Sequence, residues 1–205
     1  MATLGILGGT FNPIHNGHLL MARTAAAAFG MERVLLVPAH VPPHKEVAGG
    51  VSAAHRLAMV RLAAAGDPLL AVDTVEIERG GVSYAIDTVR TLARRHPGHD
   101  LAFIIGVDSL LELYRWKEVH AFLTLCRVVT VDRPGIIGRP LQPRDLNLPE
   151  AASRRLLDDV VTGPLSDASS SEIRRRIAKR LPIGYLVPSP VERYIAEHAL
   201  YRPAN

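Results

Sequence analysis

The stretch TLGILGGTFNPIHNGH, residues 3–18, decides the fold class, because an apolar run ends in two glycines and a helical pattern follows at once. Residues 3–7 predict a short buried strand, which Gly8 and Gly9 stop. The Ala-rich residues 17–29 then predict a helix. A strand, a glycine-bearing loop and a helix in this order are typical of the start of an α/β unit.

Strand and helix patterns continue to alternate along the chain. Further strands are expected at residues 34–37, 69–78, 100–105, 127–131 and 160–161, and further helices at 52–65, 84–96, 170–180 and 190–198. Residues 135–149, which contain five Pro or Gly residues, are expected to form a surface excursion. The alternation favours a Rossmann-like, doubly wound parallel sheet with helices on both faces. We expect residues 1–205 to form a single domain, with residues 165–205 as a small C-terminal helical subregion.

Composition excludes several classes of protein. The 205 residues are 48% hydrophobic and 21% charged, as in a soluble globular protein, and 24 Lys+Arg against 20 Asp+Glu give a net charge of only +4. No apolar run approaches the ~18 residues of a membrane span. The single cysteine, Cys126, cannot form an internal disulfide, and the sequence does not start with a basic segment followed by an apolar one, so we expect a cytoplasmic protein. One Trp, five Tyr and four Phe are too few for a nucleic-acid surface built on stacked rings.

The loop after the first strand has the chemistry of an anion site. Paired glycines let a backbone approach a ligand closely, and the start of the next helix offers free N–H groups and the positive end of a dipole. His15 and His18 are three residues apart, so both rings would lie on one side of a helical turn and could donate to phosphate oxygens. Zinc is disfavoured because no second Cys/His pair accompanies them.

The string GGTFNPIHNGH, residues 8–18, resembles the signature of the nucleotidyltransferase superfamily that shares a His-x-Gly-His element with class I aminoacyl-tRNA synthetases. Within that superfamily, the chain resembles the bacterial nicotinate-nucleotide adenylyltransferases from about Leu4 to about Ile195. The resemblance implies that His15 and His18 are catalytic. It assigns a set of N-terminal positions to ATP and its phosphates: Gly8, Gly9, Thr10, Phe11 and Gly17.

Four later segments resemble the mononucleotide site of these enzymes. PPHK, residues 42–45, would bring Lys45 to a substrate phosphate, and SYAIDT, residues 83–88, would hold the pyridine end through Tyr84, Ala85 and Thr88. Ala85 stands where the family usually has threonine, so the sequence leaves open the preference between nicotinate and nicotinamide mononucleotide.

GVDSL, residues 106–110, and the pair Trp116-Lys117 complete the resemblance to the mononucleotide site. By that resemblance, Asp108 would accept from a ribose hydroxyl and Trp116 would stack on the pyridine ring, as a carboxylate and an indole can. The alternative interpretation of Trp116 is ordinary core packing.

SSSEIR, residues 169–174, resembles a C-terminal phosphate-binding signature. Serines at a helix start make good caps, and an arginine in the first turn can fork onto phosphate. By this resemblance, Ser169 and Ser170 are assigned to phosphate binding and Arg174 to catalysis. The alternative is a plain capped helix with a basic exposed face. Arg133, in Arg-Pro-Gly, also occupies a position similar to the family's, but an arginine in a turn is common.

The resemblance implies adenylyl transfer from ATP to nicotinate mononucleotide, giving nicotinate adenine dinucleotide and pyrophosphate, without a covalent intermediate. Mg²⁺ would be held by the ATP phosphates and water, so no protein cage of carboxylates is expected. The implied partners are ATP and the mononucleotide, with no nucleic acid and no membrane, in a monomer or homodimer. Two alternatives stay open: a pantetheine-phosphate adenylyltransferase or other nucleotidyltransferase of this fold, and a nucleic-acid-binding regulatory protein using residues 174–180.

Overall fold

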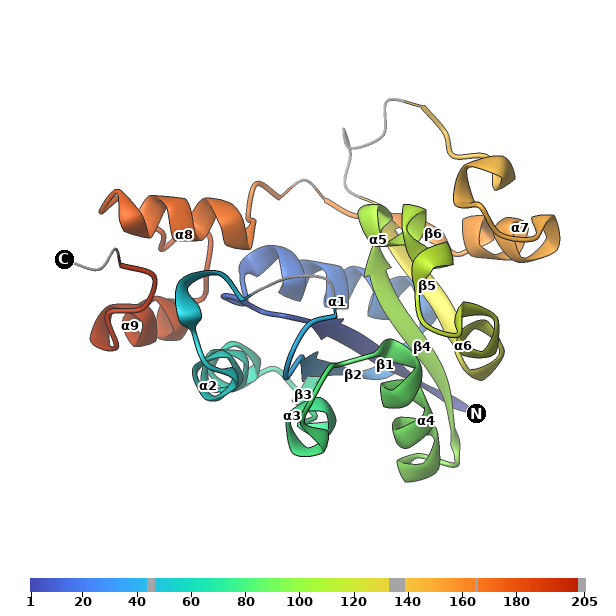
Figure 1. Ribbon diagram of the computed structural model, residues 1–205, viewed down its shortest axis with the longest axis horizontal. Helices are drawn as coiled ribbons and strands as arrows, with labels where there is room; N and C mark the ends of the chain where they lie inside the picture. The colour runs from blue at the N-terminus through green and yellow to red at the C-terminus, as the bar shows by residue number, and fades with distance from the viewer. Residues whose placement is uncertain (44–46, 133–138, 165, 203–205) are drawn as a thin grey trace.

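The computed structural model describes residues 1–43, 47–132, 139–164 and 166–202, and within these ranges six strands form one parallel sheet (Figure 1). The strand order is β3-β2-β1-β4-β5-β6. The strands are β1 (Ala2–Gly9), β2 (Met31–Pro38), β3 (Leu70–Val72), β4 (His99–Gly106), β5 (Arg127–Asp132) and β6 (Val160–Thr162). The chain moves outward from β1 to β3 and then returns to β4, so the switch point of this Rossmann order lies between β1 and β4.

Helices cover both faces of the sheet, which confirms the doubly wound prediction (Figure 1). The helices of the described chain are α1 (Asn16–Phe29), α2 (Ala53–Ala64), α3 (Val75–Arg79), α4 (Ala85–Arg95), α5 (Val107–Leu111), α6 (Val119–Leu125), α7 (Glu150–Asp158), α8 (Ser170–Ala178) and α9 (Ser189–Glu197). Three short 3-10 turns are also present in this part of the chain: η1 (Ala48–Gly50), η2 (Leu113–Arg115) and η3 (Pro143–Leu146).

Two hydrophobic clusters form the core, one on each face of the sheet. Successive residues of a strand point to opposite faces, so Leu7 joins the cluster built with α1, α2, α8 and α9, whereas Ile6 joins the cluster built with α4, α6 and α7. Ile173 of α8 and Val191 of α9 are fully buried in the first cluster. The C-terminal helices are therefore packed against the same core as α1.

Local signals in the sequence set several helix ends. Ser52 caps α2 by accepting a hydrogen bond from the backbone N–H of His55 at 3.3 Å. Gly30 ends α1 with φ at 60°, a left-handed conformation that glycine adopts without strain. Ser169 caps α8 by accepting from the N–H of Glu172 at 3.2 Å.

The predicted strand at residues 69–78 is wrong over most of its length. Only Leu70–Val72 is a strand, because the carboxylate of Asp73 accepts from the N–H of Val75 at 2.8 Å and starts α3 there. Helix α7 was not predicted, and it occupies the residues just after the expected surface excursion. Residues 133–138 of that excursion lie outside the described residues.

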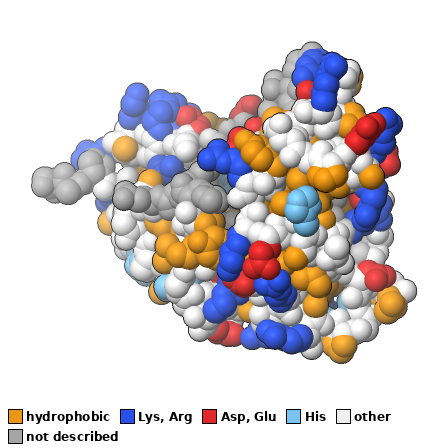
Figure 2. All heavy atoms as spheres, turned by 45° about the vertical axis from the view of Figure 1, so that its right-hand side comes forward, with side chains coloured by type: hydrophobic (Ala, Val, Ile, Leu, Met, Phe, Trp, Pro, Cys, Tyr) orange, Lys and Arg blue, Asp and Glu red, His pale blue; other side chains and the backbone are white. Residues whose placement is uncertain are grey.

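The surface carries no single basic face in the view of Figure 2, where Lys and Arg side chains lie in separate groups, most with Asp or Glu nearby. Ion pairs explain part of this arrangement. Glu172 contacts Arg175 at 2.7 Å and Arg176 at 3.6 Å, which partly neutralises the exposed side of α8. Among the described residues, no helix is long and apolar enough to cross a membrane.

Candidate active site

The candidate site lies at the carboxyl ends of β1, β2 and β4, next to the switch point of the sheet. The loop after β1 carries His15, the loop after β2 begins at Ala39, and α5 after β4 carries Asp108. Parallel strands bring these three connections to one edge of the sheet. Segments far apart in the sequence therefore meet where a ligand of this fold binds.

His15 and His18 lie together at the start of α1. Their rings stack with centroids 3.6 Å apart and planes inclined by 29°. The backbone N–H of His15 donates to Nδ1 of His18 at 3.2 Å, so a neutral His18 ring carries its proton on Nε2. That N–H, together with the positive end of the α1 dipole, suits an anionic ligand. The structure thus brings the two predicted catalytic histidines together.

The residues around the histidine pair fix its position. Phe11 is buried, has φ of 48° and meets the His18 ring edge-on with centroids 5.0 Å apart. A Cβ added at Gly9 would lie 3.1 Å from the Phe11 ring, and one added at Gly17 would lie 3.1 Å from Nδ1 of His15. These glycines make room for the two side chains, a packing role that the sequence did not indicate.

Helix α8, which carries the C-terminal motif, is held against the loop after β1. The Ser170 hydroxyl donates to the carbonyl of Pro13 at 2.9 Å, and Nη1 of Arg174 donates to the carbonyl of Asn12 at 2.7 Å. Ser169 serves as the cap of α8. Nη2 of Arg174 donates to the Ser171 hydroxyl at 3.2 Å, and a guanidinium has five N–H groups, enough to bind a phosphate as well.

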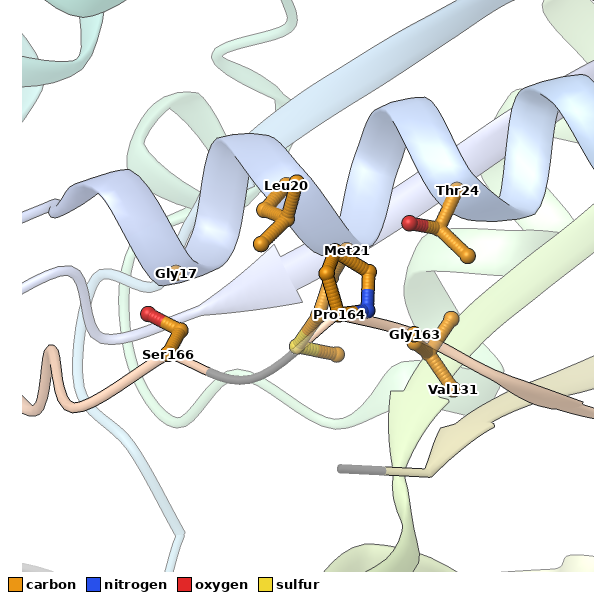
Figure 3. A pocket seen from close by; sticks show the side chains of 8 residues that line it. All are labelled: Gly17, Leu20, Met21, Thr24, Val131, Gly163, Pro164 and Ser166. Atoms are coloured by element: carbon orange, nitrogen blue, oxygen red, sulfur yellow. The ribbon is translucent and has the colours of Figure 1, made fainter. Parts of the chain in front are cut away.

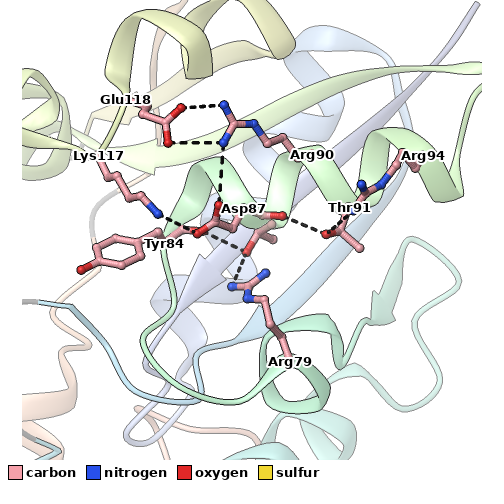
Figure 4. A network of polar contacts seen from close by, with 9 residues as sticks. Arg79, Tyr84, Asp87, Arg90, Thr91, Arg94, Lys117 and Glu118 are labelled. Atoms are coloured by element: carbon pink, nitrogen blue, oxygen red, sulfur yellow. Dashed lines mark hydrogen bonds and ion pairs between the residues drawn. The ribbon is translucent and has the colours of Figure 1, made fainter.

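The two segments expected at the pyridine end also meet (Figure 4). Nζ of Lys117 lies 4.6 Å from the centre of the Tyr84 ring and 3.2 Å from the carboxylate of Asp87. Trp116 is half-buried, and its ring contacts Phe103 and Phe122 with centroid distances of 5.8 and 5.4 Å. One side of Trp116 therefore packs on the core, as the alternative interpretation supposed, while part of the side chain stays accessible.

Thr88 lies behind this segment. Its side chain is fully buried, and its hydroxyl donates to the carboxylate of Glu76 at 2.6 Å. This position is in the interior, away from a surface where a mononucleotide would bind. Burial raises the pKa of Glu76, although hydrogen bonds from Thr88 and Ser83 oppose the effect.

Of the remaining residues that the sequence assigned to the site, the structure locates four and does not describe two. Asp108 is exposed in the first turn of α5, directly after β4, and Ala85 is the half-buried first residue of α4. Gly8 and Thr10 lie at the end of β1 and just beyond it. Lys45 and Arg133 lie outside the described residues.

Sequence reasoning missed a buried polar network beneath the loop after β1. The Tyr201 hydroxyl donates to Oδ1 of Asn12 at 2.8 Å, and Nδ2 of Asn12 donates to the carbonyl of Ala48 at 2.8 Å. Burial raises the pKa of Tyr201. Arg56 was missed as well. Because these contacts join residues up to 189 positions apart, no local pattern could have indicated them.

A small cavity of about 10 Å³ opens beside the start of α1 (Figure 3). It is lined from α1 and from the ends of β5 and β6 by Gly17, Leu20, Met21, Thr24, Val131, Gly163, Pro164 and Ser166. A cavity of this size has room for about one water molecule, so a larger group would enter only if the walls moved apart. No group of three or more His, Cys, Asp or Glu side chains is arranged to hold a metal ion in the described part of the chain.

Comparisons with known proteins agree with this geometry. A family model described as cytidylyltransferase-like matches residues 6–176. A protein of Geotalea daltonii named as a nicotinate-nucleotide adenylyltransferase is 43% identical over an alignment of 213 positions that covers 97% of each chain. A protein of Citrifermentans bemidjiense with the same name is 43% identical over 98% of this chain and 99% of its own.

Among solved structures, Plasmodium falciparum nicotinic acid mononucleotide adenylyltransferase complexed with NaAD is similar, with a TM-score of 0.74 over 98% of both chains. Its sequence is only 16% identical, so this likeness establishes the fold alone.

Proposed function

The chain belongs to the nicotinate-nucleotide adenylyltransferase family, and from that premise we propose that it transfers the adenylyl group of ATP to nicotinate mononucleotide. The mononucleotide phosphate attacks the α-phosphorus, the bond from that phosphorus to the β-phosphate oxygen breaks, and pyrophosphate leaves. Nicotinate adenine dinucleotide is the other product.

The observation that carries this proposal is that His15 and His18 lie together at the start of α1, while Arg174 of α8 donates to the carbonyl of Asn12 in the loop that leads to them. The attacking phosphate is already ionised, so the protein has to align two polyanions and neutralise charge rather than remove a proton. His18 donates from Nε2 to the phosphates, and Arg174 adds a fixed positive charge.

The segments around Tyr84 and Trp116 bind the nicotinate mononucleotide, and Asp108 accepts hydrogen bonds from its ribose hydroxyls. The accessible part of the indole can stack on a cationic pyridine ring, while its contacts with Phe103 and Phe122 hold its orientation. Lys45 is assigned to the substrate phosphate from the sequence alone.

Mg²⁺ enters this proposal as the ion that ATP carries. The donor groups gathered at the site are imidazole and guanidinium N–H groups, which suit phosphate oxygens and do not bind Mg²⁺. Excess EDTA should therefore stop turnover and leave the unfolding temperature of the free protein unchanged. A fall in that temperature would indicate a metal site in the protein itself.

Two other functions are less well supported. A pantetheine-phosphate adenylyltransferase would not need the pyridine segment that Tyr84, Lys117 and Trp116 build. Binding of nucleic acid through α8 would use a basic face that Glu172 partly neutralises. The proposed enzyme accordingly acts on small molecules, does not bind nucleic acid, is located in the cytoplasm and is a monomer or a homodimer.

The nucleotide donor provides the first test, because the matching family model is described as cytidylyltransferase-like. Purified protein is incubated with nicotinate mononucleotide and either ATP or CTP, and the dinucleotide is identified by mass spectrometry. We expect the adenine dinucleotide from ATP and little product from CTP. A product formed from CTP alone would contradict the proposal.

A further inference from the structure

Arg56 of α2 is a buried cation that no motif accounts for. Only 1% of its surface is exposed. Its guanidinium donates to three backbone carbonyls: Nη1 to Thr10 at 2.7 Å and Ala39 at 2.6 Å, and Nη2 to His40 at 2.8 Å. Two loops, one leaving β1 and one leaving β2, are thus joined through one side chain.

Burying this charge is costly, which makes simple core filling a poor explanation. No salt bridge to Arg56 occurs among the residues that the structure describes, and its charge is balanced by the three carbonyl dipoles and by the more distant carboxyl group of Glu76. An apolar side chain packed beside Met59 and Val60 of the same helix would fill the space at lower cost. What an apolar residue could not do is hold three carbonyls in fixed positions.

The two loops lead to the two halves of the candidate active site. Thr10 lies in the loop that reaches the His15–His18 pair. On the other side, the N–H of His40 donates to the Ser83 hydroxyl at 2.9 Å, and its ring nitrogen Nδ1 lies 3.1 Å from the carbonyl of Gly81. Ser83 directly precedes Tyr84, so Arg56 connects the phosphate-binding loop to the pyridine segment through His40.

We propose that Arg56 is a positioning residue for the adenylyl transfer: it fixes the phosphate-binding loop relative to the mononucleotide segment, so that the attacking phosphate lies in line with the α-phosphorus. This inference rests on the proposed function. Arg56 bonds to backbone carbonyls of the two loops and to none of the side chains assigned to hold the substrates. It therefore affects the alignment of the two substrates more than the affinity for either. A misplacement of about 1 Å in such a reaction costs on the order of 100-fold in rate.

The test is R56K, because lysine keeps the positive charge but lacks the planar fork that reaches all three carbonyls. We expect kcat to fall about 10- to 100-fold, with the KM for ATP and the KM for nicotinate mononucleotide each within about 3-fold of wild type. The matched control is M59A, at a fully buried position of the same helix. It should lower the unfolding temperature and leave the kcat of the folded enzyme unchanged.

Three results would overturn the proposal: a wild-type kcat in R56K, an equal loss of kcat in R56K and M59A, or a rise in KM with kcat preserved. If R56K does not fold, S83A is decisive, since it removes the acceptor for the His40 N–H. A lower kcat with both KM values preserved supports the proposal, and a wild-type kcat overturns it. Wild-type protein that is inactive with nicotinate mononucleotide but active with another acceptor refutes the proposed function, and the Arg56 comparison is then made with that acceptor.

Discussion

The rings of His15 and His18 stack 3.6 Å apart at the start of α1, and the backbone N–H of His15 donates to Nδ1 of His18. Because that backbone donor bonds to Nδ1, a neutral His18 carries its proton on Nε2, an N–H that can donate to a phosphate oxygen. The stacked His15 ring and the edge of Phe11 restrict the rotation of His18. The pair therefore presents a donor in a fixed direction before any substrate binds.

Replacing His18 with alanine removes that donor. We expect kcat to fall about 100- to 1,000-fold, as when one preorganised donor to developing charge is lost, with a smaller change in the KM for ATP. Steady-state pyrophosphate release measures both constants. H120A is the control, because His120 is exposed on α6, and it should behave as wild type. A near-normal kcat in H18A would refute the role assigned to His18.

Trp116 is expected to bind the pyridine ring of the mononucleotide. W116A should raise the KM for nicotinate mononucleotide about 10-fold or more, since stacking on an aromatic side chain contributes ~1–3 kcal/mol, and it should leave the KM for ATP nearly unchanged. W116F, which keeps a ring against Phe103 and Phe122, should recover part of the affinity.

Tyr114 provides the control for Trp116, because it is an exposed aromatic residue two positions away. Y114A should bind both substrates as wild type does. If W116A lowers the unfolding temperature but leaves the KM for the mononucleotide unchanged, Trp116 is a core residue only.

Helix caps and strand runs were predictable because their causes are local. Ser52 bonds to an N–H three residues away, Gly30 needs only its own backbone freedom, and the apolar runs of β1 and β4 are buried on both faces of the sheet. The error at residues 69–78 has a local cause too: Asp73 starts α3 within a pattern that also alternates like a strand.

The candidate site also has parts that the sequence could predict and parts that it could not. The histidine pair, the Arg174 motif and the pyridine segment were indicated by short strings of residues, and the structure brings each string to the expected edge of the sheet. The support beneath them was not predictable. Tyr201 meets Asn12 only after the whole chain has folded, and Thr88 turns inward to Glu76 because of the tertiary position of α3.

Glu76 gives a prediction about stability and pH. Burial raises the pKa of its carboxyl above the ordinary 4.5, so the folded protein binds this proton more tightly than the unfolded chain does. The resulting contribution to stability is fully present below pH 4.5 and is lost as the pH rises through the folded-state pKa. E76Q keeps an oxygen that can accept from Thr88 but does not titrate.

We therefore expect the free energy of unfolding of wild type, relative to E76Q, to decrease as the pH rises above 4.5. Urea unfolding of both proteins between about pH 4 and pH 8 measures it, and carboxyls common to both proteins cancel in the difference. E197Q, at an exposed position of α9, should show no such trend. A difference between wild type and E76Q that stays constant with pH would contradict the assignment.

The most direct test of the proposed function is the choice of acceptor. Pyrophosphate release is measured with ATP, Mg²⁺ and the wild-type protein against nicotinate mononucleotide, nicotinamide mononucleotide and phosphopantetheine, each added alone. We predict rapid release with nicotinate mononucleotide and no release with phosphopantetheine, while nicotinamide mononucleotide reports the effect of Ala85 on the choice between acid and amide. Release with phosphopantetheine and none with either pyridine mononucleotide would contradict the account.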